Sequence, residues 1–125
     1  MLALAPASAS ARESCAPHVA ALERARRYAE EHLADASGPG VDNLARAAGL
    51  SRFHFTRLFT ARFGAPPGEW LLGRRIREAA RLLRGTELPL KEIARRCGFR
   101  EPGYFGRVFH EKTGQPPGSF RKSGV

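Results

Sequence analysis

The chain has 125 residues, enough for one domain or for two very small ones joined by a linker, and its 42% of hydrophobic residues suffice for a compact core but leave no room for a large ligand pocket. The formal charge of +9 is uneven, because residues 41–125 carry seventeen Lys or Arg against seven acidic residues. Such an excess favours a polyanionic partner, most often nucleic acid, with a merely solvated basic surface as the alternative.

Catalytic and metal-binding patterns are not recognisable in the sequence. Cys15 and Cys97 have no metal-ligand spacing, and the four histidines form no HExxH motif. No nucleophile with a neighbouring base, carboxylate pair or glycine-rich phosphate loop stands out, so we expect neither an enzyme nor a cofactor. Cys97 is expected to be a buried, unreactive thiol. Two cysteines in a helical chain favour a reducing compartment, and no apolar run approaches a membrane span, so a cytoplasmic protein is expected.

The N-terminal third is predicted to contain one helix. Residues 1–16 are rich in Ala, Ser and Pro without periodicity and are predicted to form a disordered tail. A helix follows near residues 18–34, and the segment SGPG at 37–40 ends it. The apolar stripe of this helix consists of Val19, Leu22, Ala25, Ala29 and Leu33.

A first pair of helices is predicted at about 41–48 and 51–63. Gly40 suits the N-cap of the first, Gly49 suits a left-handed turn, and Ser51 suits the N-cap of the second. In the second helix, one apolar set at helical spacing is expected to pack inward, and the remaining residues to face out. The inward set is Phe55, Leu58, Phe59 and Phe63.

A linker helix of about 67–84 and a second pair complete the chain. Pro67 suits the first turn of the linker, which ends near Gly85. Helices at about 90–97 and 102–113 flank the turn Gly98-Phe99, and a short helix follows at 117–122. No stretch alternates with period two, so the fold is predicted to be all-α with seven helices. The packing residues of the 102–113 helix are Phe105, Val108 and Phe109.

The two helix pairs are copies of one another. NLARAAGL at 43–50 matches EIARRCGF at 92–99, and FTRLFTARFGAPPGEW at 55–70 matches FGRVFHEKTGQPPGSF at 105–120. A short helix, a glycine turn and an arginine-bearing helix form the pattern of a helix-turn-helix. The duplication therefore predicts two DNA-reading heads in one chain.

The outward sides of the second helices carry groups suited to base edges. Arg57 can bond guanine O6 and N7, Thr56 can bond a base edge, Arg52 can reach a base or phosphate, and Phe53 can contact a thymine methyl. Arg107 takes the place of Arg57 in the second copy. Candidates for phosphate contact are Arg46, Arg62, Arg95, Arg96, Lys112, Arg121 and Lys122.

The linker sets a spacing. At about 1.5 Å per residue, a helix of this length spans some 25 Å and can hold two recognition helices about one DNA turn, roughly 34 Å, apart. We therefore expect one chain to occupy two successive major grooves.

With these residues in view, the chain resembles the DNA-binding domain of the AraC/XylS family of bacterial transcription regulators. The motifs are LARAAGLSRFHFTRLFTARFGAPPGEWL, RRIREAARLL and LKEIARRCGFREPGYFGRVFHEKTGQPPGSFR. The resemblance implies a domain over residues 17–122 that binds promoter DNA and contacts RNA polymerase. It also implies either a stand-alone regulator of the MarA and SoxS type, binding as a monomer, or the C-terminal part of a longer protein. By matching positions, the base-reading residues would be Ser51, Arg52, Phe53, Thr56, Arg57, Arg100, Glu101, Pro102, Gly103, Tyr104 and Arg107.

Two alternatives remain open at this point. Gly103 and Gly106 stand where family members often have a polar residue, which favours a non-specific, nucleoid-type binder. The other alternative is an adaptor that contacts RNA polymerase and binds DNA weakly.

Overall fold

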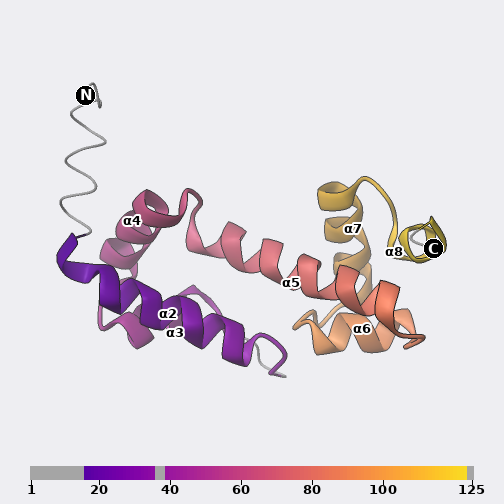
Figure 1. The fold of residues 1–125 in the computed structure, drawn as a ribbon, viewed down its shortest axis with the longest axis horizontal. Coiled ribbons are helices and arrows are strands. Elements are labelled where there is room, and N and C mark those ends of the chain that lie inside the picture. The colour runs from indigo at the N-terminus through magenta and orange to yellow at the C-terminus, as the bar shows by residue number, and fades with distance from the viewer. Residues whose placement is uncertain (1–15, 36–38, 124–125) are drawn as a thin grey trace. The chain divides into compact units, whose positions relative to one another are not determined.

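A computed structural model describes residues 16–35 and 39–123 (Figure 1). This part of the chain contains seven α-helices, one short 3-10 helix and no strand, which confirms the predicted all-α class. The predicted tail of residues 1–16 lies outside the described residues except for Ala16, which opens the 3-10 helix η1 (Ala16–His18). None of the helices in the described ranges has the length and apolar character needed to cross a membrane.

The chain divides into two compact units, and each contains one copy of the duplicated motif. The first unit comprises the residues up to Glu31 together with Pro39–Trp70, and the second comprises His32–Gly38 and the residues from Leu71 onward. The linker helix α5 (Pro67–Gly85) begins in the first unit and continues in the second. Each copy of the motif therefore has its own core.

The first unit packs α2 (Val19–His32) with α3 (Val41–Ala48), α4 (Arg52–Phe63) and the start of α5. The apolar stripe predicted for α2 is buried at Leu22, Ala25 and Ala29. On the side of α4 that packs inward, the ring of Phe59 lies 4.5 Å from that of Phe63 and 5.5 Å from that of Trp70, measured between centroids. The buried residues of α3 and α4 are Leu44, Ala45, Ala48, Phe55, Leu58 and Phe59.

Local chemistry sets the turn between α3 and α4. Gly49 adopts the left-handed conformation with φ 72°, and its N–H donates to the carbonyl of Arg46 over 3.0 Å. The hydroxyl of Ser51 accepts a hydrogen bond from the N–H of His54 at 3.2 Å, and so satisfies one of the free donors at the start of α4. Both predicted roles are confirmed.

Replacing Ser51 with alanine is expected to lower the free energy of unfolding by about 1 kcal/mol, because the N–H of His54 loses its cap. Urea denaturation of both proteins measures the difference. Ser119→Ala, at an exposed serine inside a helix, is the matched control and should change stability by less than about 0.5 kcal/mol. Equal losses in the two variants would show that the cap does not stabilise α4.

The second unit packs the rest of α5 against α6 (Leu90–Arg96), α7 (Pro102–Thr113) and α8 (Pro117–Ser123). In this unit α6 ends one residue earlier than predicted, because Cys97 is its C-cap. The Cys97 side chain is 0% exposed, and burial raises the pKa of its thiol to about 12. The predicted burial of this thiol is thus confirmed. The core of the unit is formed by Ile76, Ala79, Leu82, Leu83, Ile93, Ala94, Cys97, Phe99, Phe105, Val108, Phe109 and Phe120.

Candidate nucleic-acid interface

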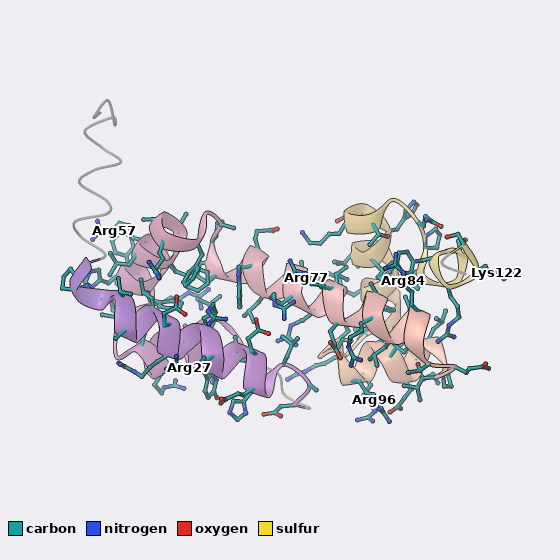
Figure 2. The ribbon with its side chains drawn as sticks, viewed as in Figure 1. Arg27, Arg57, Arg77, Arg84, Arg96 and Lys122 are labelled. Atoms are coloured by element: carbon teal, nitrogen blue, oxygen red, sulfur yellow. The ribbon has the colours of Figure 1, made fainter. Side chains whose placement is uncertain are left out.

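The side of α4 opposite its core residues faces solvent. Arg52, Phe53 and Arg57 are exposed, and Thr56 is half-buried. Phe53 is 78% exposed, which is unusual for so large an apolar side chain. Figure 2 shows Arg57 projecting outward from α4. The residues predicted to read bases from this helix therefore do share an accessible surface.

Arg57 and Phe53 form a pair on this surface. The guanidinium carbon of Arg57 lies 5.9 Å from the centroid of the Phe53 ring, within the range of a cation–π interaction. Such a contact restricts a long, flexible arginine whose guanidinium carries five N–H donors suited to a base edge. Phe53 thus orients Arg57 as well as offering an apolar surface of its own.

Arg52 is held by an ion pair with Asp42 of α3. The Nη1 to Oδ1 distance is 2.8 Å, and both side chains remain more than half exposed. Ion pairs as exposed as this one contribute roughly 0–1 kcal/mol, so Arg52 can exchange Asp42 for a phosphate or a base edge at little cost.

The start of α7 presents the corresponding surface of the second unit. Arg107 lies over the ring of Tyr104, with 5.7 Å between the guanidinium carbon and the ring centroid, and Tyr104 is 44% exposed. The aromatic–arginine pair therefore occurs in both copies, although the spacing is four residues in α4 and three in α7. The other predicted residues of this surface are also exposed, namely Arg100, Glu101, Pro102 and Gly103.

Alignment of the two copies does not reveal the second pair. Tyr104 aligns with His54, and Gly103 aligns with Phe53, so the aromatic residue changes position between the copies. An outward aromatic residue three or four positions before an arginine is the signal that identifies both pairs, because these spacings place two side chains side by side on a helix.

Gly103 and Gly106 border open space. A Cβ atom added at either position would meet nothing within 4 Å. The protein's own packing therefore does not require glycine there, and a closely approaching duplex is one physical reason for a bare backbone.

The seven candidates for phosphate contact fall into three groups. Arg46, Lys112 and Lys122 are exposed. Arg62 is paired with Glu23 at 3.1 Å, while Arg95 and Arg96 share Glu92. Arg121 forms the third group, and it is half-buried.

The second and third groups differ in the partners of their arginines. Hydrogen bonds from Arg95 and Arg96 lower the pKa of the partly exposed Glu92 carboxyl to about 2, so it is ionised at any physiological pH and offsets part of the local positive charge. Arg121 instead donates to the carbonyl oxygens of Leu83, Thr86 and Leu88, at 3.3, 3.3 and 2.7 Å. Its guanidinium thereby stabilises the end of α5, a structural role that its sequence position does not reveal.

Two helix-turn-helix motifs, each with an exposed arginine on its second helix, define this chain as a DNA-binding module. A family described as "Helix-turn-helix domain" matches residues 44–123. The chain is 34% identical over 100 residues to the arabinose operon regulatory protein of Escherichia coli, covering 80% of this chain and 34% of that protein. It is 31% identical over 99 residues to the "Probable transcription factor PqrA" of Proteus vulgaris, covering 79% of this chain and 81% of that protein.

A solved structure shows the same fold. The DNA-binding domain of AdpA, described as a global transcriptional factor in complex with a target DNA, superposes with a TM-score of 0.77 and 34% identity, covering 82% of this chain and 90% of that one. The chain belongs to the AraC/XylS family of helix-turn-helix transcription regulators. This is a family of DNA-binding proteins and not of enzymes. The chain spans only 34% of the arabinose regulator and 23% of a related Bacillus subtilis regulator.

Proposed function

We propose that this protein is a sequence-specific transcription regulator that inserts α4 and α7 into successive major grooves of a promoter. The observation that carries this proposal is the exposed aromatic–arginine pair on the second helix of each motif. The base-reading set is the one predicted from the sequence, namely Ser51, Arg52, Phe53, Thr56, Arg57, Arg100, Glu101, Pro102, Gly103, Tyr104 and Arg107.

In α4, Arg57 is assigned the most specific contact. Its two parallel N–H groups match the O6 and N7 acceptors of guanine, a pattern that the other bases do not present in the major groove. Phe53 lies beside it and offers an apolar surface to a thymine methyl group. A thymine next to a guanine is therefore the expected preference of this head.

In α7, Arg107 is assigned the equivalent guanine contact, oriented by Tyr104. The carboxylate of Glu101 suits the N4 donor of cytosine, and Arg100 suits a base or a phosphate. Gly103 has no side chain and so leaves space for the DNA to approach the helix closely. The second head thus has fewer side chains for reading but retains one arginine placed for it.

The length of the linker helix supports binding to successive major grooves. Its 19 residues correspond to about 28 Å of α-helix, close to the roughly 34 Å that separates successive major grooves on one side of DNA. In this proposal the domain over residues 17–122 binds as a monomer, acts on the chromosome in a bacterial cytoplasm and contacts RNA polymerase from the bound promoter.

Selection of bound sites from random duplex DNA tests the proposal. The expected product is one site with two short conserved segments about one helical turn apart, bound roughly 10³-fold or more above random DNA at the same salt concentration. Equal affinity for every duplex would replace the proposal with a non-specific binder, which the bare surface at Gly103 and Gly106 favours. Very weak binding to any DNA would point instead to an adaptor for RNA polymerase.

Replacing Lys112 with alanine is expected to weaken binding to all sequences alike. A phosphate contact carries no base information, so its loss should reduce the log–log slope of affinity against salt by about one without changing the selected site. Fluorescence anisotropy at four or five salt concentrations measures both quantities. A change in base preference would assign Lys112 to reading instead.

A further inference from the structure

Arg75 of α5 is a buried arginine that donates hydrogen bonds to main-chain carbonyl groups. It is 9% exposed, and burial lowers the pKa of its guanidinium. A buried cation is tolerated only where its donors are satisfied. The Nη1 atom donates to the carbonyl oxygens of Cys97 at 3.0 Å and Leu33 at 3.1 Å, all within the second unit.

The Cys97 carbonyl lies at the end of α6, where carbonyl groups have no partner within the helix and the helix dipole is negative. A guanidinium is well suited to this position. The next residue, Gly98, has φ 88°, and a Cβ atom there would lie 1.8 Å from Nη1 of Arg75 and 2.8 Å from its Cζ. Arg75 therefore occupies the space that any side chain at residue 98 would fill.

The equivalent turn of the first motif leaves the corresponding space open. The two turns share their backbone hydrogen bonds, from Gly49 to Arg46 at 3.0 Å and from Gly98 to Arg95 at 3.1 Å. Yet a Cβ atom at Gly49 would meet nothing within 4 Å. The contact with α5 thus distinguishes two otherwise similar turns.

The starts of α4 and α7 differ in their N-caps. The N-cap of α4, Ser51, accepts a hydrogen bond from the helix, whereas the N-cap of α7, Glu101, makes no side-chain cap. Arg75 and the residues at the α7 entry line one cavity of about 280 Å³, formed by Leu72, Arg75, Gly98, Phe99, Arg100, Glu101 and Tyr104.

We propose that Arg75 is a positioning residue for base reading by α7: by holding the Cys97–Gly98 turn against α5, it sets the position of the α7 entry and of Arg107 relative to the groove. This inference rests on the proposed function. Arg75 itself contacts no base. Loss of Arg75 should therefore reduce base discrimination in the half of the DNA site that α7 contacts and leave the half that α4 contacts unaffected.

The experiment first assigns the halves of the selected site. In the wild-type protein, base positions whose discrimination disappears in Arg107→Ala belong to α7, and those lost in Arg57→Ala belong to α4. If wild type selects no site, or Arg107→Ala changes no position, the proposed function fails at this step, before Arg75 is altered.

Arg75→Ala is then compared with Arg77→Ala, which removes the same charge from an exposed position of the same helix. In Arg75→Ala, discrimination at the α7 positions is expected to fall from roughly tenfold to under about threefold, with the α4 positions unchanged. Arg77→Ala should preserve both sets, and Arg75→Lys should restore part of the loss, because an ammonium group can still donate to the Cys97 carbonyl.

Two results would overturn the inference. One is unchanged discrimination at the α7 positions in folded Arg75→Ala, and the other is equal loss at both sets of positions, which indicates general destabilisation. Circular dichroism establishes that each variant is folded. If the alanine variant does not fold, Arg75→Lys and Arg75→Gln are compared with wild type at the same positions, and the same two results decide.

Discussion

Gly98→Ala is expected to lower the free energy of unfolding by about 2.5–5 kcal/mol. Forcing a residue with a Cβ atom into the left-handed conformation costs about 1–2 kcal/mol. The new methyl group would also lie 1.8 Å from Nη1 of Arg75, so the guanidinium must leave its buried carbonyl partners. Hydrogen bonds to charged groups contribute about 1.5–3 kcal/mol, and this loss adds to the backbone strain.

Gly49→Ala is the matched control, because it has the same left-handed conformation but open space around the new methyl group. It should cost only about 1–2 kcal/mol. Urea denaturation followed by circular dichroism reports on the helices of both units. The single tryptophan, Trp70, packs on Phe59 and Phe63, so its fluorescence reports on the first unit. Equal losses in the two variants would mean that Arg75 moves aside at no cost.

Arg57→Ala is expected to cost roughly 1–3 kcal/mol of binding free energy at one base position of the selected site. The reason is geometric: the arginine fork matches guanine O6 and N7, and alanine leaves both acceptors without a partner. Affinity for other bases at that position should change little, so the variant loses preference rather than binding altogether. Competition binding with the selected site altered one base pair at a time measures the effect.

Arg46→Ala provides the contrast for this experiment. Arg46 is exposed on α3, outside the recognition helix, and is assigned to phosphate. Its loss should weaken all sequences by a similar factor and reduce the salt slope by about one. If Arg57→Ala and Arg46→Ala behave alike, Arg57 contacts the DNA backbone and does not read a base.

Helix boundaries and packing faces were predictable from the sequence because they depend on neighbouring residues. Gly49, Ser51 and Pro102 mark helix ends through the backbone conformations and caps they favour, and α3, α4 and α7 begin and end within a residue of the predicted positions. The apolar period of α4 likewise separates buried Phe55 from exposed Phe53, since a helix of 3.6 residues per turn places them on different faces.

Side-chain partners that come from distant segments were not predictable in this way. Arg75 and Arg121 have the same side chain as the exposed arginines around them, and no periodicity shows that carbonyl groups will receive their N–H donors. Those carbonyls become available only where helices end and pack, so the assignment requires three-dimensional coordinates. The duplicated pattern and its arginines thus predict from the sequence alone a DNA-binding domain with two helix-turn-helix motifs. Which arginines hold the fold and which remain free to contact DNA depends on packing, because burial and main-chain acceptors are properties of the folded chain.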